Sequence, residues 1–165
     1  MKTLYIVRHA KSSWVDITKS DFDRPLNDRG NKDAPEMARR VIKRRERIDL
    51  FVSSPAVRAK KTCQLFCREF DENVNDIVYL EQLYHASSET LYEIVRNLPN
   101  KYSYVAVFCH NPGITDFVNS LCENVRVDNV PTAGVFAVDM DIREWKDFKP
   151  RKCSYKFFDY PKANR

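Results

Sequence analysis

The sequence predicts an α/β fold, a three-layer sandwich in which a mostly parallel central sheet is flanked by helices. Short apolar runs of strand length alternate along the chain with segments whose apolar residues recur at helical spacing. This alternation favours parallel strands that are joined by helices. Length is the third observation: 165 residues suit one domain, and we expect residues 1–165 to form a single domain.

Six strands are expected, each from a short run that is rich in apolar and aromatic residues. The expected strands are 3–7, 49–53, 77–80, 103–108, 134–140 and 153–159. A long polar connection over 10–28 separates the first strand from the first helix.

Four helices are expected between these strands. The first spans about 30–46, where helical spacing relates Ala34, Met37, Ala38, Val41 and Ile42. Ser54 and Pro55 predict an N-cap followed by a proline at the first helical position, which opens a helix to about 70. Ser87 or Ser88 is expected to cap a helix to 97, and Gly113 to enter a helix to about 122.

Composition excludes several classes of protein. Only three glycines occur, and none lies near another, so a Walker A loop and a dinucleotide fingerprint are ruled out. The net charge of +5 fits an anionic substrate and nucleic acid equally well. No secretory pattern opens the chain and no apolar run approaches the roughly 18 residues of a membrane span.

The five cysteines are expected to be reduced, mostly buried thiols in a cytoplasmic protein without membrane contact. Cys63 and Cys67 lie one helical turn apart, which is not the spacing of a zinc knuckle. With only three histidines in the chain, we expect no metal site.

Basic residues follow three of the expected strands. Arg8 and His9 come directly after Leu4–Val7, His110 follows Tyr104–Phe108, and Arg58 opens the helix behind strand 49–53. Ligands of such sheets lie beyond the carboxyl ends of the strands. We therefore expect these four side chains to form one phosphate pocket.

The pocket would contain its own nucleophile. A neutral histidine can attack phosphorus and give a covalent phosphohistidine that water then hydrolyses. Arg8, Arg58 and a protonated His110 would stabilise the charge that develops on the phosphoryl oxygens. This chemistry requires no metal and no cofactor.

Five segments occur in an order that resembles the histidine phosphatase superfamily, and within it the SixA-like phosphohistidine phosphatase branch. The resemblance covers residues 3 to about 159 and implies a phosphoglycerate mutase-like fold. It implies His9 as the nucleophile, with Arg8, Arg58 and His110 around the phosphate. The segments that carry it are Leu4–Trp14, Asp21–Gly30, Ser53–Ala59, Cys109–Gly113 and Pro131–Gly134.

The resemblance also suggests roles in substrate binding. It places Ser12 near the phosphate and brings Thr132 toward the site from its turn. Asp21 and Arg24 either line the rim or brace the loop. The glutamate that serves as the acid in mutases falls on Gln82, which leaves Glu81 as a candidate acid or a surface residue.

The substrate is expected to be a protein that carries phosphohistidine. Only one helix fits between residues 80 and 103, where mutases and acid phosphatases have a large lid insertion, so the pocket stays open. A phosphoramidate also depends less on an enzymatic acid, because its imidazole leaving group can arrive protonated. We expect phosphate or sulfate to bind in the pocket, and the protein to be a monomer or weak dimer.

Two alternatives remain open. One is a broad small-molecule phosphomonoesterase of the same superfamily. The other is a non-catalytic phosphate- or nucleic-acid-binding module, which the basic stretch Arg39–Arg47 could serve, although it also fits a solvated helical face; we expect no nucleic acid. Cysteine-phosphatase chemistry is excluded because no cysteine has an arginine six positions later.

Overall fold

The computed structural model describes residues 1–163, and its centre is one six-stranded sheet with the order β3-β2-β4-β1-β5-β6. The first four strands run parallel to their neighbours among themselves, whereas β5 is antiparallel to both β1 and β6. The expected mostly parallel sheet is thus confirmed. The strands are β1 Lys2–Arg8, β2 Leu50–Ser53, β3 Val78–Tyr79, β4 Tyr104–Cys109, β5 Val135–Met140 and β6 Ser154–Asp159.

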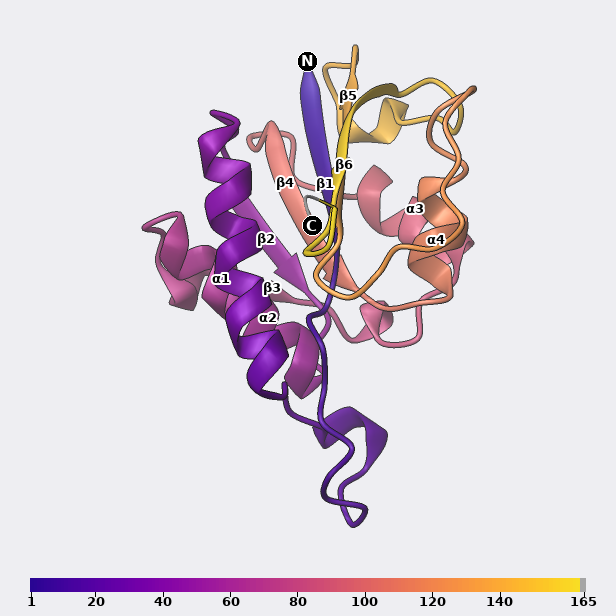
Figure 1. Ribbon diagram of the computed structural model, residues 1–165. Coiled ribbons are helices and arrows are strands. Elements are labelled where there is room, and N and C mark those ends of the chain that lie inside the picture. Colours follow the sequence, from indigo (N-terminus) through magenta and orange to yellow (C-terminus); the bar gives the residue numbers. More distant parts are fainter. Residues whose placement is uncertain (164–165) are drawn as a thin grey trace.

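Helices cover both faces of this sheet. Figure 1 shows α1 and α2 on one side and α3 and α4 on the other, which gives the three predicted layers. The helices are α1 Asp28–Lys43, α2 Val57–Glu69, α3 Ser88–Arg96 and α4 Gly113–Val118. Short 3-10 turns are η1 Asp21–Asp23, η2 Val74–Asp76, η3 Glu81–Leu83 and η4 Trp145–Asp147.

The alternation of side chains along β1 divides the core into two halves. Leu4 and Ile6 belong to the cluster that contains residues of α3 and α4. Tyr5 and Val7 point the other way, into the cluster under α1 and α2. Because both faces of the strand are buried, its sequence is an unbroken apolar run rather than an alternating one.

The first helix begins and ends earlier than predicted. It starts at Asp28 because the Asn27 side chain accepts a hydrogen bond of 2.8 Å from the Gly30 amide and so forms an N-cap. It ends at Lys43, since Arg45 takes up a left-handed backbone with φ of 62°. The basic run Lys43–Arg45 crosses this end, so the sequence gives no sign of it.

Two other predicted helix boundaries were wrong. α2 begins at Val57 rather than behind an N-cap at Ser54, whose hydroxyl instead bonds to His110. α4 ends at Val118 rather than near 122, because the Asn119 amide side chain bonds both backbone groups of Val127 and ties down the returning chain. The Ser87 cap of α3 is confirmed by its bond from the Thr90 amide.

Two glycines allow the first turns of helices to pack closely against loops that follow strands. A β-carbon at Gly30 would overlap the carbonyl of Lys11, and one at Gly113 would overlap the carbonyl of Ala86. Only glycine fits these contacts, which draw α1 onto the segment after β1 and α4 onto the segment after η3.

The cysteines agree with the prediction of buried thiols. All five are buried and unbonded, and burial raises the pKa of Cys109 and Cys153 to about 12. Within residues 1–163, no helix combines the length and the apolar character that crossing a membrane requires.

Candidate active site

The register of β1 and β4 sets two histidines side by side. Arg8 lies opposite Cys109, so His9 and His110 are the next residues along both strands. The His9 amide donates to the carbonyl of Cys109 over 3.2 Å. The two ring centroids are 5.2 Å apart, and the residues are 7% and 4% exposed. The structure therefore brings together the two imidazoles that the sequence placed at separate strand ends.

His9 is held as a neutral ring with one nitrogen available. Its Nδ1 lies 2.7 Å from the carbonyl oxygen of Ala10, which can only accept, so Nδ1 carries the proton. Burial, and after it the charges of Arg58, Arg8 and Arg24, lower the pKa of His9 to about 3 against the opposing effect of the Ala10 bond. At neutral pH, the lone pair of Nε2 is free to act as a nucleophile.

With no anion bound, His110 is neutral, whereas its predicted role is that of a cation beside the phosphoryl oxygens. Burial lowers its pKa to about 3, and the neighbouring His9 and Arg58 act in the same direction. Its Nε2 lies 2.8 Å from the Ser54 hydroxyl, which accepts from the Ala56 amide and can donate its own proton to the ring. The ring proton then resides on Nδ1, which is buried without a partner.

Unpaired donors gather around these histidines. Within the described residues, the buried side-chain nitrogens and oxygens that lack a hydrogen-bond partner number four. Each such group costs about 1–3 kcal/mol if nothing satisfies it, so their presence at one site requires an explanation. They are the Nε atoms of Arg8, Arg24 and Arg58 and the Nδ1 of His110.

The arginines lie close enough to influence one another and His9. Burial lowers the pKa of Arg8, and the charge of Arg58 lowers it further. Asp21 offsets part of the charge of the three arginines, since it pairs with Arg24 and Arg58. The remaining positive charge and the unused N–H groups suit the site to a further anion.

Asp21 braces two of these arginines. Arg58 donates to its backbone carbonyl at 2.6 Å and to its carboxylate at 3.0 Å. Arg24 donates to the other carboxylate oxygen at 3.2 Å. A hydrogen bond from Tyr84, together with both arginines, holds the pKa of Asp21 far below its usual range. Of the two roles that the sequence left open for Asp21, the contacts favour bracing.

Arg24 belongs to the pocket, and Ser12 supports it. Arg24 is 8% exposed, lowers the pKa of His9 and donates to the Ser12 hydroxyl at 2.8 Å. Its guanidinium lies 3.4 Å from the centre of the Trp14 ring. The hydroxyl that was expected near the phosphate therefore holds an arginine of the pocket.

Sequence analysis missed Tyr84 and His85. Tyr84 meets the His110 ring edge-on at 5.6 Å and lies 3.9 Å from the ring of His85. The Nε2 of His85 lies 3.9 Å from the Asp21 carboxylate, and its side chain is 66% exposed. One signal was present, because both residues follow the strand expected at 77–80.

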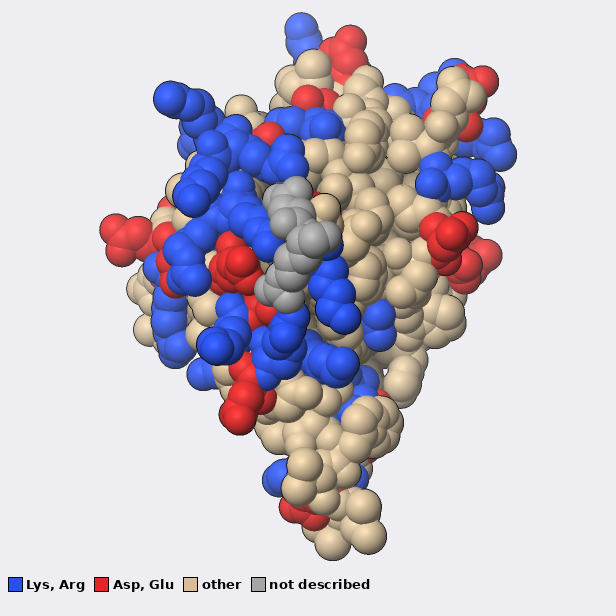
Figure 2. Space-filling view, in the orientation of Figure 1, with Lys and Arg blue, Asp and Glu red and all other residues tan. Residues whose placement is uncertain are grey.

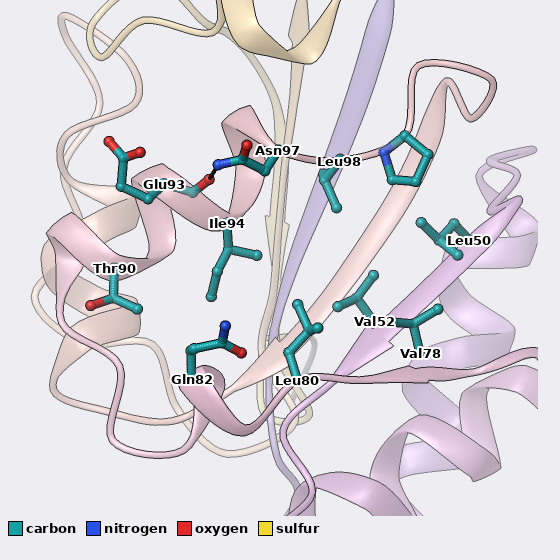
Figure 3. A pocket seen from close by; sticks show the side chains of 11 residues that line it. Leu50, Val52, Val78, Leu80, Gln82, Thr90, Glu93, Ile94, Asn97 and Leu98 are labelled. Atoms are coloured by element: carbon teal, nitrogen blue, oxygen red, sulfur yellow. Dashed lines mark hydrogen bonds between the residues drawn. The ribbon is translucent and has the colours of Figure 1, made fainter.

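Two predicted residues have no recorded contact with the histidines in the described part of the chain. Thr132 lines a separate cavity of about 510 Å³ with Lys11 and Arg29, although the adjacent Ala133 amide donates to the carbonyls of Arg8 and His9. Glu81 is exposed on η3. Its neighbour Gln82 lines an apolar groove of about 420 Å³ between α3 and strands β2 and β3, as Figure 3 shows.

The basic stretch Arg39–Arg47, which begins on α1 and continues past its end, is largely engaged in contacts within the chain. Figure 2 shows lysines and arginines gathered over this helix. Arg39 pairs with Glu69 and Arg40 with Asp159. The guanidiniums of Arg44 and Arg47 lie over aromatic rings. These contacts give most of the arginines a structural role.

Comparison with known proteins assigns the family. Residues 4–103 match the model of the histidine phosphatase superfamily, branch 1, and the chain belongs to this superfamily. Together with the solved structures that it resembles, this membership supports phosphatase activity.

Within the superfamily the chain is SixA-like. A protein from Agrobacterium tumefaciens assigned as phosphohistidine phosphatase SixA superposes with a TM-score of 0.82 at 28% identity, covering 97% of this chain and 98% of that one. The protein histidine phosphatase SixA complexed with tungstate gives 0.80 at 20%, covering 96% of each. A mycobacterial glucosyl-3-phosphoglycerate phosphatase gives 0.63 at 13%, covering 97% and 98%.

A curated relative from Arabidopsis thaliana is an uncharacterized chloroplastic protein. It is 31% identical over 121 residues, which are 68% of this chain. The chain spans about half of that relative's length, since the match covers 55% of it.

Proposed function

We propose that the protein is a phosphatase that hydrolyses phosphohistidine on proteins through a covalent intermediate on His9, without a metal. The observation that carries the proposal is the cluster of four buried donor nitrogens without partners beside a neutral imidazole. Phosphate is a tetrahedral anion with several acceptor oxygens, and it satisfies such donors.

Binding of the phosphoryl group resolves the unfavourable charges of the pocket. We expect its oxygens to accept from the Nε atoms of Arg8, Arg24 and Arg58 and from Nδ1 of His110, which are buried without partners among the described residues. The negative charge also raises the pKa of His110, because it favours the charged form of the ring. His110 thereby becomes a stronger donor as charge develops on the phosphoryl oxygens.

The first chemical step exchanges one imidazole for another. His9 Nε2 forms a bond to phosphorus while the P–N bond of the substrate breaks. With its other nitrogen protonated, the substrate ring leaves as neutral imidazole and needs no proton from the enzyme. The new phosphohistidine is of the same chemical type as the substrate, since Nδ1 of His9 keeps its proton, which is hydrogen-bonded to the Ala10 carbonyl.

Water completes the reaction. The water oxygen attacks phosphorus and the P–Nε2 bond breaks. The protons of the water leave with the inorganic phosphate, and Nε2 of His9 recovers its lone pair. The Nδ1–H bond to Ala10 holds the ring in one orientation through both steps.

Two observations support a protein substrate. Between β3 and β4 the chain has only η3 and α3, so no inserted lid domain lies in that connection. The candidate acid Glu81 is exposed and without recorded contact to the histidines among the described residues, which favours a leaving group that needs no acid. The fold alone does not separate substrates, because a sugar-phosphate phosphatase shares it.

The test is to trap the intermediate and rank substrates. A small protein with radiolabelled phosphohistidine should transfer label to the wild type in an acid-labile, alkali-stable form, and His9→Asn should acquire none. We expect kcat/KM for this protein to exceed those for 3-phosphoglycerate and an aryl phosphate, with no loss in a chelator. Label on His9→Asn would contradict the mechanism, and preference for the small esters would favour the phosphomonoesterase alternative.

A further inference from the structure

The connection between β1 and α1 presents three large apolar side chains to solvent. Trp14, Val15 and Ile17 are 72%, 92% and 92% exposed. Scattered exposed apolar residues are ordinary, but several adjacent ones mark a surface that binds a partner. We refer to these three residues as the apolar tip. The other large hydrophobics exposed in the described chain are separate in sequence: Met1, Ile42, Val78 and Tyr155.

The apolar tip projects beyond the body of the molecule. Figure 1 shows the segment after β1 extending past the carboxyl end of the sheet, the end at which the two histidines follow their strands. In Figure 2 the same projection carries mostly uncharged surface. Its few charges include both signs, Asp16 and Lys19, so it is not built to attract a polyanion.

The base of this projection is part of the phosphate pocket. Trp14 lies against the guanidinium of Arg24, which also bonds to Ser12 and Asp21. Asp21 in turn holds Arg58. Trp14, the first residue of the apolar tip, is therefore fixed against Arg24, whose charge acts on His9.

The two arms of the projection are joined across its base. A β-bridge links Ser12 to Leu26, and the Ser13 amide donates to the carbonyl of Pro25 over 2.8 Å. Such cross-links reduce the freedom that docking must remove. The base of the projection is therefore held in one arrangement.

We propose that the apolar tip is the docking surface for the protein that carries the phosphohistidine, a folded partner with apolar surface around its modified histidine. The inference rests on the proposed function. A phosphoryl group on an imidazole reaches the buried pocket only if its carrier's backbone lies within one side-chain length of the mouth. The carrier must then cover the rim, where the tip stands. A small phosphoester or a short peptide is too small to cover both sites.

The experiment compares substrates of different size on a variant of the tip. Val15→Ser/Ile17→Ser leaves Trp14, and therefore Arg24, in place. On a small folded protein phosphorylated at histidine with phosphoramidate, kcat/KM should fall at least about tenfold, through KM. On a short peptide with the same phosphohistidine, and on an aryl phosphate, it should stay within about twofold of wild type. Ile42→Ser/Tyr155→Ser, which changes exposed apolar residues elsewhere, is the matched control and should leave all three unchanged.

Each other outcome overturns the inference in a recognisable way. An equal loss on all three substrates would mean that the tip shapes the pocket, and no loss would mean that the carrier binds elsewhere. A wild-type dimer that dissociates in the variant, seen by sedimentation, would assign the tip to a second copy of the chain. If the wild type hydrolyses the aryl phosphate but not the phosphohistidine protein, the proposed substrate is wrong and the docking surface falls with it.

Discussion

Two regions border η3, and they differ in chemistry. The groove in Figure 3 is lined mainly by apolar side chains such as Leu80 and Ile94, and the Asn97 amide on its wall donates to the Glu93 carbonyl at 2.7 Å. The histidine pocket contains the four buried nitrogens that have no partner in the described chain. Tyr84, just after η3, contacts Asp21 of that pocket.

In this protein the candidate active site is marked by buried donors without partners rather than by the volume of a hollow. An apolar hollow at a sheet edge leaves few polar groups to satisfy, so it needs no ligand. Buried N–H groups without acceptors are costly, and several in one place are retained where a ligand accepts from them. Substitutions in the two regions, and the dependence of stability on pH, test this difference.

Removal of the nucleophile should have the largest effect. His9→Ala should lower the rate of phosphohistidine hydrolysis by about a thousandfold or more, because no other group can form the intermediate. Val78→Ser, in the groove, is the matched control and should leave the rate unchanged. Initial rates on both variants measure the difference, and comparable losses in the two would break the comparison.

Loss of Arg58 should reduce catalysis without unfolding the protein. Arg58→Ala removes a donor of the oxyanion site, so we expect kcat/KM to fall by about a hundredfold or more. The thermal midpoint should change little, since the lost bonds to Asp21 are offset by relief of the repulsion with Arg8. Inorganic phosphate should raise the midpoint of the wild type but not of the variant. A large drop in the midpoint would contradict the placement of Arg58 in the pocket.

The histidines should make stability depend on pH. An unfolded histidine titrates near 6.5, whereas His9 and His110 have a pKa of about 3 in the fold. Between these values the unfolded chain binds more protons, so stability falls as the pH drops from 6.5 toward 3. Each histidine contributes a slope of at most about 1.4 kcal/mol per pH unit. Urea unfolding of wild type and His9→Asn from pH 7 to 4 tests this, and equal slopes would show that His9 does not contribute.

Residues on the outer side of η3 should have the smallest effect. Glu81→Gln should leave kcat within about twofold, because the carboxylate is exposed and a phosphoramidate needs no acid from the enzyme. The measurement is kcat on the phosphohistidine protein and on an aryl phosphate. A loss confined to the ester would assign Glu81 as the acid for that leaving group.

Much of the fold and part of the site could be predicted because they follow local patterns. The buried run before Arg8 and the one before His110 are continuous since both faces of β1 and β4 are covered, and such runs are easily recognised. The ends of helices were less predictable. Ser54 resembles an N-cap in sequence, yet its hydroxyl contacts a histidine 56 residues away, which no local pattern shows.

The polar connection after β1 was hardest to interpret, because it has no periodicity. The burial of Arg24 and the position of Asp21 between two arginines depend on contacts with α2 and with Tyr84. The neutral state of His110 in the ligand-free structure was not predictable for a related reason. A pKa depends on burial and on neighbouring charges, and both arise only when distant segments meet.

Local patterns along the chain were enough to predict the alternation of strands and helices. They also placed Arg8, His9, Arg58 and His110 at one edge, because the carboxyl ends of parallel strands lie at the same edge of a sheet. The folded arrangement was needed for the proton on Nδ1 of His9, for the neutral His110, for the position of Arg24 beside His9, and for the discovery of Tyr84 and His85. This is because the periodicity of apolar residues in a sequence indicates which face of a helix or strand is buried. Protonation and hydrogen bonding instead depend on distances between atoms that the chain brings together only when it folds.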